Sequence, residues 1–256
     1  MDNKLNKLDV TKSPGPDGLH PRILYELRNE IAFPLKILYQ KSFKLTTLPL
    51  DWTSGHIVAI HKKGNKNDPS NYRLVCLTSV VCKIFESIIR DSLMEHFITN
   101  ELLSNKQYGF IKGRSTVLQL LRILDDWTTQ IDQGYQVDVI YTDFEKAFDK
   151  VPHQRLLNKL KSYGITDALL KWIENFLCSR KQCVGVNGKF SKWFLVKSGI
   201  PQGSILGPIL FLIYINDLPE SCDISSYDVN LYLYADDAKV YKTIINSENN
   251  KKTFRQ

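Results

Sequence analysis

LYLYADDAKVY (residues 231–241) places two adjacent carboxylates, Asp236 and Asp237, between two apolar, aromatic-rich runs. Such runs are typical of β-strands, and a short polar centre is typical of a turn, so the stretch predicts a β-hairpin with both carboxylates at its turn. Neighbouring carboxylates at a turn can bind a metal ion. An Asp-Asp pair in a turn is nevertheless more often a solvated loop, so a second acidic strand end is needed before the pair indicates a site.

The sequence VDVIYTD (residues 137–143) supplies that second acidic strand end. Its apolar run stops at Asp143, and FEKAFD (residues 144–149) follows at once in a pattern that we interpret as helical. Asp143 and Asp236 are far apart in the chain, so only a sheet that sets the two strand ends side by side would join them. Carboxylate oxygens are the ligands that Mg²⁺ prefers.

Composition sets outer limits on the class of protein. With 256 residues, of which 43% are hydrophobic, the chain suits one large domain or two small ones with a sizeable core. A net charge of +7 favours an anionic partner without requiring one. Five cysteines without a C-x-x-C pair indicate reduced, mostly buried thiols rather than disulfides or a zinc site. No signal peptide or membrane span is visible, so we expect an intracellular protein.

Basic residues gather around a predicted strand at 57–60. The strand runs into KKGNK (residues 62–66), and Tyr72-Arg73 begins the return limb of a predicted hairpin. Positive groups on both limbs suit the binding of phosphate, although solvated surface charge explains them as well. The candidate cations are Lys62, Lys63, Lys66 and Arg73.

Helical periodicity covers much of the remaining chain. It predicts helices at about 21–31, 34–46, 79–99, 116–130, 152–163, 166–177 and 205–215, and a hairpin joins 182–186 to 192–196 around Asn187-Gly188. Thr116 and Gln119 fit a capping box, which places Lys112 and Arg114 beside exposed amide groups where a backbone phosphate can bind. A plain loop-to-helix junction explains the glycines of this region equally well.

The turn SGIPQGS (residues 198–204) leads into the apolar helix at 205–215. Its glycines allow close approach of a ligand to the backbone and leave Gln202 exposed at a helix start. Taken alone, this stretch is better read as an ordinary strand-to-helix connection.

Six ordered blocks together resemble the reverse transcriptase domain of non-LTR retrotransposons, the jockey-like long interspersed elements. The blocks are SPGPDG (13–18), the strand and basic loop to NYR (71–73), QYGF with GRST (107–116), YTDFEKAFD (141–149), SGIPQGS (198–204) and YADD (234–237). The resemblance implies an α+β right-hand polymerase fold in which a small antiparallel palm sheet packs on helices. It places fingers at about 1–80 and 150–203 and palm at about 81–149 and 204–245.

The resemblance also implies roles for individual residues. In the family pattern Asp143 and Asp236 bind metal, Asp237 assists, and the backbone carbonyl of Phe144 completes the metal's ligand shell. The residues implied to bind the incoming dNTP are Lys62, Arg73, Phe144, Gln202 and Phe148, the last lying beneath the sugar. The residues expected to contact nucleic acid are Lys63, Lys66, Lys112 and Arg114.

The implied activity is RNA-directed DNA polymerisation, in which a primer 3′-hydroxyl attacks the α-phosphate of a dNTP with the help of two Mg²⁺ or Mn²⁺ ions. The implied partners are an RNA template and a DNA primer, in the nucleus and cytoplasm and without membrane contact. Alternatives are an inactive relic that only binds nucleic acid, a group II intron maturase, or an RNA-templated RNA polymerase. Phe148 argues against the last, because its bulk would exclude a 2′-hydroxyl.

Two features depart from the family pattern. Leu74 follows Arg73 where the family usually has proline, so we expect a differently shaped fingers hairpin. Little chain follows Asp237, so we expect a fragment that lacks the thumb and the endonuclease, which normally belong to the same polyprotein, and that polymerises poorly by itself.

Overall fold

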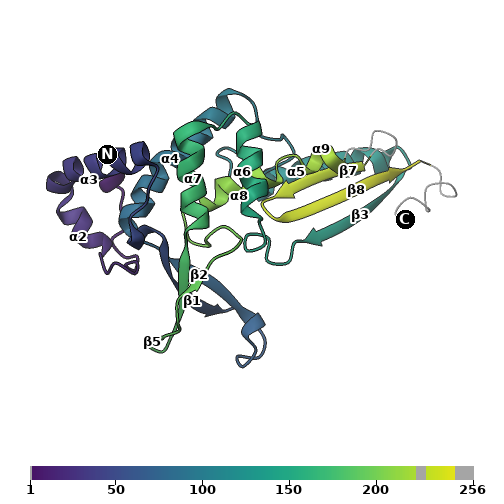
Figure 1. Ribbon diagram of the computed structural model, residues 1–256. Coiled ribbons are helices and arrows are strands. Elements are labelled where there is room, and N and C mark those ends of the chain that lie inside the picture. Colours follow the sequence, from purple (N-terminus) through teal and green to yellow (C-terminus); the bar gives the residue numbers. More distant parts are fainter. Residues whose placement is uncertain (1, 223–228, 246–256) are drawn as a thin grey trace. The chain divides into compact units, whose positions relative to one another are not determined.

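The computed structural model describes residues 2–222 and 229–245, and these form two compact units that alternate along the chain. The first unit comprises Met1–Thr99 and Phe148–Leu210, and the second comprises Asn100–Ala147 and Phe211–Gln256. Figure 1 shows the elements of each. Because the second unit is built from two distant stretches, neither stretch completes it alone.

The first unit combines helices with a mixed sheet. Its helices are α1 (Asp2–Leu5), α2 (Pro21–Glu26), α3 (Arg28–Leu45), α4 (Val80–Thr99), α6 (His153–Ser162) and α7 (Asp167–Cys178). Short 3₁₀ turns occur at Leu50–Trp52 and Pro69–Asn71. Its strands are β1 (Ser54–His61), β2 (Tyr72–Leu77), β4 (Lys181–Val186), β5 (Lys189–Phe190) and β6 (Phe194–Leu195). The sheet order is β2-β1-β4-β5 with β6 also on β4; β1 and β4 are parallel and the other pairs antiparallel.

Aromatic rings fill the core of the first unit. Tyr39 of α3 stacks on Phe85 of α4 with ring centroids 4.7 Å apart, and Phe85 meets Trp172 of α7 edge to face at 5.1 Å. The Tyr39 hydroxyl donates to the carbonyl of Val81 at 2.8 Å, so this buried polar tip is satisfied. These contacts fix the three long helices to one another.

The second unit is a three-stranded antiparallel sheet packed on a helix. Its strands are β3 (Gln136–Asp143), β7 (Val229–Tyr234) and β8 (Asp237–Ile244), in the order β3-β8-β7 (Figure 1). Helix α5 (Thr116–Asp132) packs on the sheet, and Ile123, Tyr232 and Tyr241 form a buried cluster between them. Helix α9 (Leu218–Cys222) lies against β7, and α8 (Gly207–Ile215) spans the boundary between the units.

Most predicted elements are confirmed, and the α+β class with them. The exposed or partly exposed thiols are Cys178 and Cys222, while the other three cysteines are buried and all five are free. The loop Asn187-Gly188 has positive φ at both residues, as a tight hairpin turn requires. No helix in the described parts of the chain is both long and apolar enough to cross a bilayer.

Three local predictions are wrong. The helix break that was predicted between residues 31 and 34 lies instead at Leu27, between α2 and α3. Pro34 lies inside α3, because Leu35 and Tyr39 continue the buried face of that helix beyond the proline. Ser115, not Thr116, caps α5: its hydroxyl accepts from the amide of Leu118 at 3.2 Å. The stretch after Asp143 is a series of turns with positive φ at Lys146, not a helix.

Candidate active site

The β7–β8 hairpin presents the two adjacent carboxylates. Tyr234 pairs with Asp237 in the ladder, so Ala235 and Asp236 form the loop of the hairpin. Ala235 has φ of 55°, a left-handed conformation that non-glycine residues seldom adopt. The hairpin loop therefore consists of two residues, and Asp237 belongs to β8 rather than to the loop.

The third carboxylate lies across the neighbouring strand. Asp143, the last residue of β3, pairs directly with Asp237, the first residue of β8. Directly opposed residues of antiparallel strands share a face and have Cβ atoms about 4.5–5.5 Å apart. The sheet thus brings Asp143 to the acidic hairpin as predicted, but its register partner is Asp237, and Asp236 stands next to the pair in the loop.

The donor chemistry of this strand end suits a hard cation. Asp143 and Asp237 are exposed and Asp236 is half-buried, and in the described structure none of the three carboxylates takes part in an ion pair. Oxygen-only donors of this kind fit Mg²⁺ or Mn²⁺. Residues 2–222 and 229–245 contain no group of three His, Cys, Asp or Glu side chains placed to hold a metal. The strand end presents an opposed pair of carboxylates, Asp143 and Asp237, with a third, Asp236, adjacent in sequence.

In the first unit, Lys62 directly follows β1 and Arg73 lies on β2, so the two cations come from the two limbs of the β1–β2 hairpin. Arg73 pairs with Ile60, and the amide of Lys62 donates to the carbonyl of Asn71 at 2.8 Å, which continues the ladder. The backbone of Lys62 is thus held close to the limb that carries Arg73, and both side chains are exposed. Leu74 pairs with Ala59, so β2 continues through the position where the family usually has proline.

The turn at 198–204 is tied to the segment that begins at Phe148. The amide of Ile200 donates to the carbonyl of Phe148 at 2.8 Å, and the side chain of Gln202 donates to the carboxylate of Asp149 at 3.0 Å. The carbonyl of Gln202 accepts from the amide of Cys76 on β2 at 2.6 Å. The structure therefore brings Phe148 and Gln202 together, next to the strand that carries Arg73.

A buried glutamate accepts hydrogen bonds from the backbone that follows this turn. Glu86 of α4 is fully buried, and its Oε2 accepts from the amides of Ile205 and Leu206 at 2.7 and 3.2 Å, just before α8 begins. Glu86 was not among the predicted site residues, because it lies within an apolar helical pattern. Its sole signal was a charge among residues of the buried face of α4.

A second buried polar residue contacts the acidic hairpin. The side chain of Gln107 bonds to the backbone of Ala235 and of Gly109. Gln107 belongs to the QYGF block, but the sequence by itself indicates no role for it. Its partner is distant in sequence, so no local pattern could have indicated it.

The family model for reverse transcriptase (RNA-dependent DNA polymerase) matches residues 60–252, which include the strands that carry the carboxylates and the basic loop with β2. The chain belongs to the reverse transcriptase family. The resemblance inferred from the six blocks is therefore confirmed.

Curated relatives of this reverse transcriptase chain include several Drosophila melanogaster proteins. The probable RNA-directed DNA polymerase from transposon BS is 29% identical over 84% of the chain and 24% of its own length. The corresponding protein from transposon X-element is 29% identical over 90% of the chain and 25% of its length. The RNA-directed DNA polymerase from mobile element jockey is 29% identical over 93% and 26%. The chain thus spans about a quarter of the relatives that it matches.

The four remaining basic candidates of the reverse transcriptase chain differ in what they contact. Lys63, Lys66 and Lys112 are exposed. The guanidinium of Arg114, by contrast, is half-buried and donates to the carbonyls of Ser104 and Gln107 at 2.7 and 2.5 Å. Arg114 therefore also fixes the segment that precedes α5.

Proposed function

We propose that the chain is the catalytic domain of an RNA-directed DNA polymerase of a non-LTR retrotransposon, with the second unit as the core of the palm and the first unit carrying the fingers. The observation that carries the proposal is the pairing of Asp143 with Asp237 at the end of a three-stranded antiparallel sheet, next to Asp236 in the hairpin loop. Membership of the reverse transcriptase family supports nucleotide polymerisation as the reaction that these carboxylates serve.

Asp143, Asp236 and Asp237 are the residues that would hold Mg²⁺, with the carbonyl of Phe144 as a further oxygen donor. When two divalent ions are bound, they stabilise the attacking and leaving oxygens of in-line phosphoryl displacement. The protein's own contribution is to fix the carboxylates at a rigid strand end. Mutual repulsion of the crowded carboxylates also favours occupancy of the site by cations.

Side chains of the first unit would bind the nucleotide. Lys62 and Arg73, on the two limbs of the β1–β2 hairpin, suit a triphosphate, since arginine binds phosphate through its planar fork and lysine as a point charge. Phe148 would contact the sugar and exclude a 2′-hydroxyl. Gln202 would contact the nucleotide and template, held in place by Asp149.

Exposed lysines would contact the template and primer through their phosphates. Lys63 and Lys66 lie in a loop that is ordered by its own polar groups: the Tyr72 hydroxyl donates to the carbonyl of Lys66 at 2.8 Å, and His61 contacts the carbonyl of Gly64 at 3.1 Å. Lys112 precedes α5. Such contacts are independent of sequence, as polymerisation on any template requires.

Primer extension with Asp143→Asn and Asp236→Asn tests the proposal. Each variant removes a metal-binding charge without removing a core contact, so both should abolish RNA-templated incorporation of dNTPs, whereas Asp237→Asn should reduce it less. The assay is run on the 256-residue chain and on the same chain joined to the thumb region of a relative. Unchanged rates in either of the first two variants would remove that residue from the metal site. A relic that only binds nucleic acid would show salt-dependent binding and no synthesis in either form.

A further inference from the structure

We propose that Gln107 is a positioning residue for the metal site, because it fixes the backbone of the hairpin loop, which contains Asp236 and leads directly into Asp237. The inference rests on the proposed function. Gln107 itself touches no reacting group; it acts through Ala235.

The side chain of Gln107 is bonded at both ends. Its Oε1 accepts from the amide of Ala235 at 2.9 Å and from the amide of Gly109 at 2.7 Å, and its Nε2 donates to the carbonyl of Ala235 at 3.4 Å. The side chain is 2% exposed. One amide group thus satisfies both backbone groups of Ala235 in place of water.

Ala235 needs such support because of its conformation. A non-glycine residue at φ of 55° is strained, and a residue in that state persists only where its surroundings hold it. Ala235 is itself buried, so without Gln107 its amide would lose its hydrogen-bond partner. The loop could then relax, and relaxation would move Asp236, which follows directly.

Gly109 allows this close approach. A Cβ built on Gly109 would collide with the backbone nitrogen of Ala235. Only glycine therefore lets the segment of Gln107 lie flat against the hairpin loop, which explains the glycine in the QYGF block.

The segment of Gln107 is itself held on both sides. The amide of Leu233 donates to the carbonyl of Lys106 at 2.9 Å, and the amide of Tyr108 donates to the carbonyl of Leu233 at 2.8 Å, a parallel bridge to β7. On its other side, Arg114 donates to the carbonyl of Gln107. Gln107 is therefore a fixed support and not a mobile surface group.

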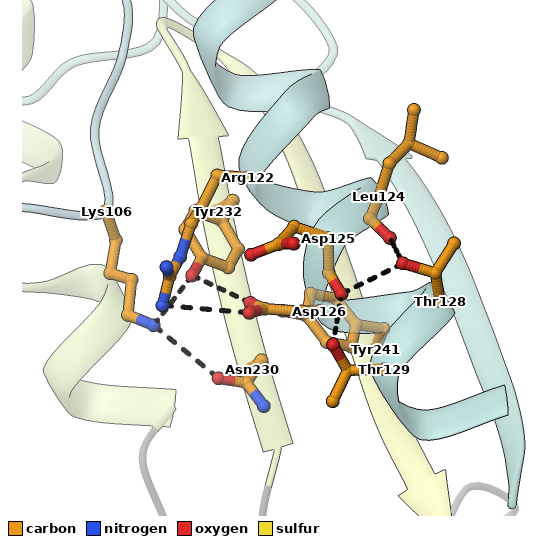
Figure 2. Close-up of polar contacts among 10 residues, drawn as sticks. All are labelled: Lys106, Arg122, Leu124, Asp125, Asp126, Thr128, Thr129, Asn230, Tyr232 and Tyr241. Atoms are coloured by element: carbon orange, nitrogen blue, oxygen red, sulfur yellow. Dashed lines mark hydrogen bonds and ion pairs between the residues drawn. The ribbon is translucent and has the colours of Figure 1, made fainter. Parts of the chain in front are cut away.

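A polar cluster anchors the same segment and the strands of the hairpin to α5 (Figure 2). The ammonium of Lys106 lies 4.3 Å from the ring centroid of Tyr232, and the hydroxyls of Tyr232 and Tyr241 donate to Asp126 of α5 at 3.3 and 2.7 Å. Arg122 is ion-paired with Asp126 at 3.6 Å. Burial, together with the bond to Asp126, raises the pKa of Tyr241, so it stays a donor.

Manganese binding by the 256-residue chain tests the inference without requiring synthesis. Gln107→Leu removes all three bonds at similar size, and loss of groups that orient metal ligands typically lowers metal affinity by roughly 10–100-fold. We expect a loss of that order, measured by the electron paramagnetic resonance of free Mn²⁺, together with faster hydrogen exchange at the Ala235 amide. Gln107→Glu keeps an acceptor for both amides and should recover part of the affinity.

Gln119→Leu is the matched control. Gln119 is a fully buried glutamine of the same unit, but its Oε1 accepts from Lys239 and not from the loop. Its variant should bind Mn²⁺ as the parent does. An equal loss in Gln107→Leu and Gln119→Leu, or no loss in Gln107→Leu, would overturn the inference.

Two further variants keep the outcomes distinct. If Gln107→Leu does not fold, Gly109→Ala perturbs the same loop from the other side, and unchanged Mn²⁺ affinity in that variant would contradict the role of Gln107. If Asp143→Asn binds Mn²⁺ as tightly as the parent, the proposed metal site itself fails, and the inference fails with it. A loss in Asp143→Asn without a loss in Gln107→Leu rejects the inference alone.

Discussion

Asp143 and Asp237 face each other directly across the antiparallel strands β3 and β8, so two carboxylates stand side by side at the end of the sheet. Like charges in that relation destabilise a sheet. The fold therefore carries a local cost that a divalent cation would remove.

Asp143→Asn should stabilise the metal-free protein while abolishing synthesis. Removing one of two opposed like charges relieves repulsion of about 0.2–1 kcal/mol, the usual size of a cross-strand pair. Thermal unfolding in EDTA measures this gain, and added MgCl₂ should stabilise the parent but not the variant. Asp138→Asn is the control, because Asp138 on the same strand pairs with Lys242 and its loss should not stabilise. A lower melting temperature for Asp143→Asn would contradict the repulsion.

Phe148→Val should relax the choice of sugar. If Phe148 excludes a 2′-hydroxyl by bulk, the smaller side chain should raise ribonucleotide incorporation, with a change in discrimination of about 1–3 kcal/mol. The measurement is the ratio of kcat/KM for dNTP and rNTP. Phe144→Val is the control, because the role proposed for Phe144 uses only its backbone carbonyl. Equal selectivity in Phe148→Val and the parent would show that Phe148 only packs.

Lys112 and Arg114, two residues apart, should respond differently to substitution. Lys112→Ala should change the slope of log affinity for duplex against log salt by about 0.9, the loss of one phosphate contact, and leave stability unchanged. Arg114→Ala should lower the free energy of unfolding by about 1–3 kcal/mol, because its loss strips a charged donor from two carbonyls. Filter binding at several salt concentrations and urea unfolding separate the two effects. If Lys112→Ala and Arg114→Ala were equally stable, the hydrogen bonds of Arg114 would contribute little to the free energy of unfolding.

Glu86 should matter for stability through its acceptor oxygen. Glu86→Ala leaves the amides of Ile205 and Leu206 without their acceptor, at a cost of about 1–3 kcal/mol for each buried group. Glu86→Gln keeps a side-chain oxygen for those amides and should cost less. Urea unfolding measures both, with the exposed Glu95 of the same helix replaced by alanine as the control. If Glu86→Gln were as destabilising as Glu86→Ala, the negative charge rather than the acceptor would be what α8 requires.

Alkaline pH should destabilise the first unit through its buried thiols. Burial raises the pKa of Cys82 well above its ordinary value of 9.0, and also raises the pKa of Cys76. A raised pKa in the folded state means that the unfolded chain loses its protons first, so the stability contribution is complete below about pH 9 and declines above it. Thermal unfolding between pH 7 and 10 checks this, and Cys82→Ala should flatten the decline. A melting temperature constant to pH 10 would contradict it.

The elements that the sequence predicted well are those with a strong local pattern. The apolar, aromatic-rich runs of β7 and β8 and the short polar stretch between them specify the hairpin. Pro34 misled the prediction, because packing of Leu35 and Tyr39 outweighs the lost backbone bond within α3. Thr116 misled it because Ser115 competes for the same capping position.

The residue types of the candidate site could be predicted from the sequence, but the buried side chains that hold its backbone in place could not. The acidic strand ends were visible in the sequence, whereas their register, which sets Asp143 opposite Asp237, depends on the whole sheet. Gln107 acts on a backbone group 128 residues away and Glu86 on one 119 residues away. Buried polar side chains that bond to distant backbone leave no periodic signal.

The alternation of the two units has a consequence for biosynthesis. Strand β3 pairs with β8, which leaves the ribosome on the order of ten seconds later at the usual 5–20 residues per second. During that interval the first unit's later segments are being made, and β3 presents an unpaired strand edge with Ile140 and Tyr141 on it. The three-stranded sheet of the second unit therefore assembles only after the later segments of the first unit have been made. Its yield should depend on chaperones and on the speed of translation more than that of a domain built from one continuous stretch.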